Sequence, residues 1–179
     1  MRHYFGKMRG CGRSQCAADP LEAAWSFIGA ICGIGLVAWL CEHLASPSDG
    51  AILIGSFGAS AVLAYGAPAG PLSQPRNLVG GHVLSALVGV GTWQALGGTP
   101  WLAAAVAVGT AIALMHMTGT LHPPGGATAL IAVTGSPAIH DLGYGYVVAP
   151  VGAGAFIILG VALVINNIPK HRRYPQHWW

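Results

Sequence analysis

The stretch Leu121-His122-Pro123-Pro124-Gly125-Gly126-Ala127-Thr128 interrupts an otherwise apolar region of the chain. Proline lacks a backbone N–H and glycine has no side chain that favours a helix, so this stretch breaks a helix that runs into it. Inside a bilayer, a broken backbone is tolerated only where protein covers it or where it lines a watery cavity. The stretch therefore indicates a pathway through a membrane; a tight turn between two packed helices is the alternative.

The composition indicates that the rest of the chain lies in a bilayer. Of the 179 residues, 54% are hydrophobic and 7% are charged, whereas a soluble domain carries about 25% charged residues. Because so few charges cannot cover a globular surface, membrane lipid is the expected partner of the molecule. The net charge of +3 lies almost wholly in the two tails, so no nucleic-acid partner is expected.

Six apolar segments of unequal length follow one another along the chain. Four are long enough to span a membrane, and two are shorter and are broken by proline or glycine. Three prolines, Pro68, Pro71 and Pro75, follow the first short segment and exclude a regular helix there. We therefore expect an all-α membrane protein. The predicted segments cover residues 21–44, 51–66, 77–96, 101–117, 125–134 and 146–168.

The two short segments resemble each other. Residues 58–64 (GASAVLA) align with residues 126–132 (GATALIA), with four identical positions. Each half of the chain then holds three segments, and because three is odd, the two halves cross the membrane in opposite orientations. In many transporters, such a repeat places the substrate site at the short or broken segments. We expect a 3+3 inverted repeat, with one repeat in residues 20–97 and the other in residues 100–169.

Positive charges at both ends of the chain predict its orientation. Six crossings place both termini on one side, which should be cytoplasmic because cytoplasmic segments are rich in Lys and Arg. The chain would have a basic cytoplasmic tail (1–19), a single transmembrane domain (20–169) in the inner (plasma) membrane, and a second cytoplasmic tail (170–179). In an alternative with four spans, the short segments are re-entrant and Arg76 lies outside. The tails hold seven of the eight Lys and Arg residues: Arg2, Lys7, Arg9, Arg13, Lys170, Arg172 and Arg173.

Two blocks of motifs resemble those of a known family. One block runs from Gly58-Ala59-Ser60 through residues 71–77 (PLSQPRN) to Gly80-Gly81-His82, and the other covers residues 121–129 (LHPPGGATA). Both blocks, in this order, resemble the HPP family of small integral membrane proteins, which is named for the His-Pro-Pro motif. The resemblance extends from about residue 25 to about residue 166. It implies a helical membrane fold, usually described with four helices, and transport of a small inorganic anion, with nitrite transport linked to plant and cyanobacterial members.

A small anion that crosses a bilayer needs hydrogen-bond donors in place of its hydration shell. The N-terminus of a helix offers free N–H groups and a partial positive charge. With Pro124 at the start of a broken helix, the N–H groups that follow would face the ligand, and glycine would let it approach closely. The repeat gives the first short segment the same role. The expected pathway residues at the two breaks are His122, Pro123, Pro124, Gly125, Gly126 and Thr128 in one half, and Gly55, Ser56, Gly58 and Ser60 in the other.

Polar side chains near the breaks are further candidates for the pathway. Arg76 is the only Lys or Arg between residues 14 and 169; it could bind an anion with two N–H groups, or it could be a loop charge that sets topology. His82 and His122 can donate to an anion or carry a proton, although His122 could instead cap a carbonyl. Gln74 and Asn77 are neutral donors.

Other classes of function have less support in the sequence. The chain has five acids in all, and neither a histidine–carboxylate cluster nor a metal-ligand set can be placed. We therefore expect no enzyme activity, no metal and no cofactor. A structural or regulatory subunit of a membrane complex is the main alternative to a transporter or channel. The sequence leaves open whether the chain forms a homo-oligomer.

Overall fold

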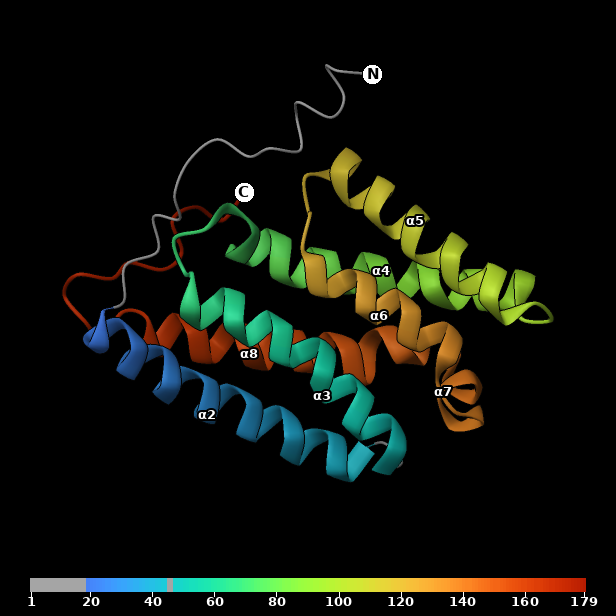
Figure 1. Cartoon of the computed structure of the whole chain (residues 1–179), viewed down its shortest axis with the longest axis horizontal. Coiled ribbons are helices and arrows are strands. Elements are labelled where there is room, and N and C mark those ends of the chain that lie inside the picture. Colours follow the sequence, from blue (N-terminus) through green and yellow to red (C-terminus); the bar gives the residue numbers. More distant parts are fainter. Residues whose placement is uncertain (1–18, 45–46) are drawn as a thin grey trace, which may run out of the picture.

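The computed structural model describes residues 19–44 and 47–179, so the predicted basic tail 1–19 lies almost wholly outside the described residues. All regular elements in this part of the chain are helical, as predicted (Figure 1). Two of them, η2 and η4, are π-helical turns that continue α3 and precede α8. The elements are α2 (Pro20–Leu44), α3 (Pro47–Ala61), η2 (Val62–Gly66), η3 (Pro71–Ser73), α4 (Pro75–Leu96), α5 (Pro100–Thr118), α6 (Pro123–Thr134), α7 (Pro137–Leu142), η4 (Val147–Gly152) and α8 (Ala153–Ile165).

Three helices in the described part of the chain are long and apolar enough to cross a membrane. They cover Pro20–His43, Pro100–Thr118 and Val147–Ile165. Helix α4 has 22 residues but is not among them, since it carries polar residues such as His82 and Ser85, which are buried inside the bundle. These helices support a multi-pass membrane protein.

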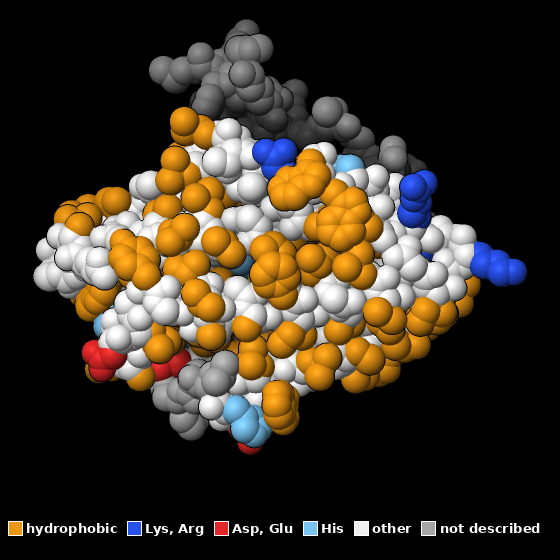
Figure 2. All heavy atoms as spheres, turned by 180° about the vertical axis from the view of Figure 1, so that it is seen from behind, with side chains coloured by type: hydrophobic (Ala, Val, Ile, Leu, Met, Phe, Trp, Pro, Cys, Tyr) orange, Lys and Arg blue, Asp and Glu red, His pale blue; other side chains and the backbone are white. Residues whose placement is uncertain are grey.

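Apolar side chains lie on the outside of the bundle, as lipid contact requires. Phe27, Trp39 and Phe156 are all more than half exposed. Figure 2 shows one face, over which hydrophobic side chains are widely spread and few charged side chains lie. On that face, Lys and Arg gather toward the upper right, whereas Asp and Glu gather at the lower left. The charges therefore separate toward opposite ends of the molecule.

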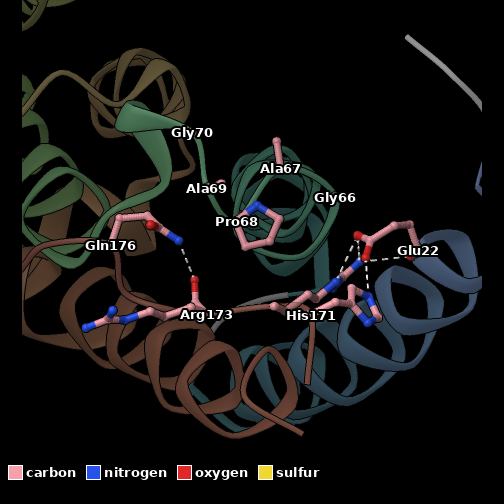
Figure 3. A pocket seen from close by; sticks show the side chains of 10 residues that line it. Glu22, Gly66, Ala67, Pro68, Ala69, Gly70, His171, Arg173 and Gln176 are labelled. Carbon is pink, nitrogen blue, oxygen red and sulfur yellow. Dashed lines mark hydrogen bonds and ion pairs between the residues drawn. The ribbon is translucent and has the colours of Figure 1, made fainter. Parts of the chain in front are cut away.

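The C-terminal segment closes one end of the bundle. The Arg172 guanidinium donates to both the side chain and the backbone of Glu22 in α2, and to the Tyr65 carbonyl in η2. The Gln176 N–H donates to Oε1 of Gln74, just before α4, at 2.8 Å. Figure 3 shows Glu22 and His171 facing each other across this end, beside the backbone of residues 66–70. The start of α2, the end of η2 and the start of α4 thus meet at one end.

The opposite end is held by contacts between α3 and the segment after α6. The Asp49 carboxylate, in the first turn of α3, accepts hydrogen bonds from the backbone N–H and the hydroxyl of Ser136. The ring of Trp93, near the end of α4, stacks on His140 of α7 with ring centroids 3.8 Å apart. Because the start of α3 meets the segment that follows the end of α6, these two helices run antiparallel to each other. Both α3 and α4 extend from one end of the bundle to the other.

Glycines of neighbouring helices make room for aromatic side chains of α3 and of η2, which continues it. The Tyr65 ring occupies the space where a Cβ at Gly29 or Gly33 of α2 would stand, and Phe57 does the same at Gly154 of α8. This is the close packing at small residues that membrane helices use in place of a hydrophobic driving force.

Two parts of the chain that were predicted as loops are helical. Helix α3 begins at Pro47 rather than near residue 51, because Pro at the first position and an acid in the first turn favour a helix start. Helix α7 lies in the expected loop after residue 135, where the Ser136 hydroxyl accepts from the Ala138 N–H and caps the helix. Both signals are local and were present in the sequence.

Candidate functional site

Five polar side chains meet inside the bundle, where α3, α4 and α6 cross. They are all buried, with exposed fractions of 0 to 3%. Ser56 and Ser60 come from α3, His82 comes from α4, and Thr128 comes from α6, which His122 precedes as the N-cap. All five were expected pathway residues, and the structure brings them together. We call them the polar cluster.

Short hydrogen bonds connect the members of the polar cluster. The His82 ring lies between two hydroxyls, with Nε2 2.7 Å from Ser60 Oγ and Nδ1 2.7 Å from Thr128 Oγ1. His122 Nε2 lies 3.0 Å from Ser60 Oγ, and its Nδ1 lies 2.9 Å from the Leu72 carbonyl oxygen. Ser56 Oγ is 3.0 Å from Thr128 Oγ1 and 3.0 Å from the Pro124 carbonyl oxygen. Every partner of either imidazole is thus a hydroxyl or a carbonyl.

The His-Pro-Pro motif places His122 in this cluster. A residue before proline is excluded from helical geometry, and His122 is extended, with φ −141° and ψ 106°. Pro123 and Pro124 then start α6 in the first turn, where their missing N–H groups do no harm. The extended backbone lets the imidazole reach the Leu72 carbonyl in η3 as well as Ser60 in α3.

Two glycines let α4 and α6 approach closely at the cluster. A Cβ built at Gly81 would lie 2.5 Å from Cβ of His122 and 2.9 Å from the Thr120 carbonyl oxygen. A Cβ at Gly125 would lie 2.7 Å from Ser85 Oγ and 2.9 Å from the Gly81 carbonyl oxygen. Real side chains do not fit at these distances, so glycine at positions 81 and 125 sets the spacing of the two helices.

Gly125, at the start of α6, does not offer the free N–H group that the sequence led us to expect. Pro123 and Pro124 have none, and the Gly125 N–H donates to the His122 carbonyl at 2.8 Å. Gly126 is also turned away from the cluster, since it lines an apolar groove of about 530 Å³ with Val108 and Ile112 of α5. The donors that the structure brings together in the polar cluster are side-chain hydroxyl and imidazole groups.

The first short segment also differs from the expectation. Gly55 and Gly58 do not begin a broken helix; they lie inside α3, which starts at Pro47. A glycine within a helix costs about 1 kcal/mol, which packing readily outweighs. Ser56 and Ser60 are one turn apart and face the same side of α3, so they reach the cluster through their hydroxyls.

The remaining candidates hold the fold together away from the cluster. Gln74 donates to the Pro68 and Gly70 carbonyls. Asn77 donates to the Leu121 carbonyl at 2.9 Å. Nη2 of Arg76 donates to the Thr118 carbonyl at 2.5 Å, which caps the end of α5, where cations are favoured.

Sequence reasoning missed three contacts, two at the polar cluster and one at the end of the bundle where α3 begins. The Leu72 carbonyl is a backbone group, and no side-chain pattern announces it. Tyr146 donates from its hydroxyl to the Thr128 carbonyl at 3.1 Å. The bond between Asp49 and Ser136 joins residues far apart in the chain. The sequence motifs could not reveal these contacts, because each contact depends on how the helices pack.

The polar cluster can donate to an anion and can pass protons, but it does not resemble a metal site. Among residues 19–44 and 47–179, no group of three His, Cys, Asp or Glu side chains gathers in a way that could hold a metal ion. In the same part of the chain, every buried side-chain nitrogen and oxygen has a hydrogen-bond partner. An ion could therefore enter only by replacing internal hydrogen bonds.

Comparisons with known proteins agree with the motifs. The family model described as "HPP, transmembrane region" matches residues 15–175. Two transmembrane proteins of Dictyostelium discoideum are 44% and 42% identical, each over 98% of this chain. The chain spans 57% and 63% of the length of these relatives. No solved structure matches. The chain belongs to the HPP family of integral membrane proteins.

Proposed function

We propose that the chain is a transporter or channel for a small inorganic anion, with nitrite as the leading substrate, and not an enzyme. The observation that carries this proposal is the polar cluster. Ionisable and polar side chains deep in a membrane bundle are costly to bury, and where they occur they mark functional sites. The hydroxyl and imidazole N–H groups of the polar cluster can donate hydrogen bonds to an anion. The cluster holds no fixed positive charge that would trap the anion. Nitrite comes from the resemblance to the family.

We also propose that the six helical runs cross the membrane as a 3+3 inverted repeat. Ser60 and Thr128 occupy equivalent places in the two aligned short segments, and both contact the same ring, that of His82. Helices α3 and α6, which contain these segments, run antiparallel. This arrangement supports a substrate site between the two halves, as in other transporters with broken helices.

Flux measurements in liposomes test this function. Purified protein is reconstituted, and uptake of nitrite, nitrate, formate and chloride is followed, with empty liposomes correcting for permeation of undissociated acid. Thr128→Val keeps the shape of the side chain but removes a donor, so we expect flux to fall about tenfold, as loss of a hydrogen bond to a charged group predicts. Thr92→Val is the matched control, since the Thr92 hydroxyl binds only the Val88 carbonyl of its own helix.

Two results would overturn the proposal. One is wild-type protein that moves none of the four anions. The other is Thr128→Val protein that folds and inserts normally yet retains full flux.

A further inference from the structure

The Leu72 carbonyl fixes the direction of the hydrogen bonds in the polar cluster. A carbonyl oxygen only accepts, so Nδ1 of His122, 2.9 Å away, carries a proton. A charged imidazole would be costly in this buried place, where no carboxylate pairs with it, and a neutral ring has one donor and one acceptor. Nε2 of His122 is therefore an acceptor, and the hydroxyl of Ser60, at 3.0 Å, donates to it.

The rest of the chain of hydrogen bonds follows from one proton for each hydroxyl. Ser60 has used its proton on His122, so Nε2 of His82 must donate to Ser60 Oγ. Nδ1 of His82 is then an acceptor and receives the hydroxyl proton of Thr128. Ser60 has one further contact, to the Ser56 carbonyl, and at 3.4 Å this is the longest of the three. The hydrogen bonds thus point in one direction, from Thr128 through His82, Ser60 and His122 to Leu72.

The two ends of this series lie at different depths in the bundle. Leu72 is partly exposed and Pro71 beside it is exposed, at the end that the C-terminal segment closes. Thr128 is in the middle, where its hydroxyl meets Ser56. Asp49, which marks the other end of α3, is seven residues from Ser56 and hence about 10 Å further along the axis. The buried residue between them that faces the core, Leu53, is apolar.

We propose that Thr128, His82, Ser60 and His122 form a proton relay that couples anion transport to the movement of a proton. This inference rests on the proposed function and deepens it. The relay connects the middle of the bundle, where the anion would bind, with the end at Leu72.

The proton transfers balance along the relay. The conjugate acid of the anion gives its proton to Thr128 Oγ1, whose own proton passes to Nδ1 of His82. The Nε2 proton of His82 passes to Ser60 Oγ, and the proton of Ser60 passes to Nε2 of His122. The Nδ1 proton of His122 leaves to a water molecule at the Leu72 carbonyl. Each side chain gains one proton and loses one, and both rings end as the opposite tautomer.

The groups around the relay do not trap the proton. The Phe57 ring of α3 packs against the His82 ring, with ring centroids 5.0 Å apart. The Tyr146 hydroxyl donates to the Thr128 carbonyl and not to a relay atom. The rings of His82 and His122 face each other edge to face, with centroids 5.1 Å apart. A proton on either ring therefore disfavours one on the other, so only one passes at a time.

Proton and anion fluxes measured in the same proteoliposomes test the relay. A pH-sensitive dye inside the liposomes reports protons while an inward nitrite gradient drives transport, with the membrane potential clamped by valinomycin and potassium. Ser60→Ala removes the middle of the relay, whereas His122→Gln keeps a donor and an acceptor but cannot pass a proton. We expect proton influx to fall about a hundredfold in both variants. Ser85→Ala is the matched control, because the hydroxyl of this buried serine of α4 hydrogen-bonds to the Met115 sulfur and not to a relay atom, and we expect the variant to retain the influx.

The outcomes separate this inference from the proposed function. Nitrite uptake without accompanying protons in wild-type protein overturns the relay and leaves anion transport standing. Proton conduction under a pH gradient that Ser60→Ala abolishes, in protein that moves no anion, supports proton passage along these side chains but overturns anion transport and its coupling to the proton. Protein that moves neither overturns both. If Ser60→Ala does not fold, His122→Gln gives the same comparison.

Discussion

Arg172 and Glu22 join the last and the first described parts of the chain across 150 residues. Nε and Nη2 of the buried guanidinium both donate to Oε2 of Glu22, at 2.9 and 2.5 Å. Nη1 donates to the Asn166 side chain at 3.0 Å. The nearby Tyr174 hydroxyl donates to the Ser73 carbonyl, and burial raises its pKa, so it remains protonated. The C-terminal segment is thus part of the fold and not a free tail.

Loss of Arg172 should therefore destabilise the protein, although the sequence suggests only a topology charge. Arg172→Gln removes charged hydrogen bonds to Glu22 and leaves the side-chain oxygen of Asn166 without its donor, which we expect to cost about 2 kcal/mol. The measurement is the melting temperature in detergent. Arg173→Gln is the control, because Arg173 is exposed. Equal melting temperatures for the two variants would contradict the structural role of Arg172.

The two histidines of the polar cluster should be opposite tautomers. The bond to the Leu72 carbonyl assigns the proton of His122 to Nδ1, and the series that follows assigns the proton of His82 to Nε2. Solid-state ¹⁵N NMR of histidine-labelled protein in liposomes distinguishes the tautomers. Loss of one signal in His122→Gln identifies His122. The same tautomer in both rings, or a charged ring, would contradict the assignment.

Replacing either of the two neighbouring glycines after His-Pro-Pro by alanine should have different effects on stability. A Cβ at Gly125 meets Ser85 Oγ at 2.7 Å, whereas a Cβ at Gly126 meets nothing closer than Val108 at 3.9 Å. We expect Gly125→Ala to push α6 from α4 and to cost roughly 1–3 kcal/mol. Gly126→Ala should be neutral or stabilise the helix by about 0.5–1 kcal/mol.

Thermal unfolding together with nitrite flux checks this pair. Gly125→Ala should lower both the melting temperature and the flux, and Gly126→Ala should retain both. A larger loss for Gly126→Ala than for Gly125→Ala would contradict this expectation and would indicate that the ligand approaches along the apolar groove beside α5.

The sequence predicts the helices well because apolar runs, prolines and caps act locally. It also names the five members of the polar cluster, because Ser60 and Thr128 stand out in the aligned short segments and His82 and His122 in the family motifs. The predicted helix start near Gly55 and Gly58 is wrong, because α3 begins at Pro47 and both glycines lie in its interior. Sequence reasoning also fails at Arg172, whose partners lie about 100 and 150 residues away. Such long-range contacts depend on packing and leave no local pattern.

The charge distribution predicts which end of the bundle faces the cytoplasm. Lys170, Arg172 and Arg173 follow α8, and the bond from Gln176 to Gln74 brings the start of α4, with Arg76, to the same end. Asp49 and the segment with Asp141 lie at the opposite end. Because cytoplasmic segments are rich in Lys and Arg, the end with the C-terminal segment should be cytoplasmic.

Cysteine labelling in intact cells checks this orientation. The four native cysteines are replaced, and a single cysteine is introduced as Asp141→Cys or His177→Cys, both at exposed positions. A membrane-impermeant maleimide should label Asp141→Cys in intact cells, because this residue would face the outside. It should label His177→Cys only after the membrane is permeabilised. Labelling of His177→Cys in intact cells would reverse the orientation, and with it the side of the membrane to which the polar cluster connects through Leu72.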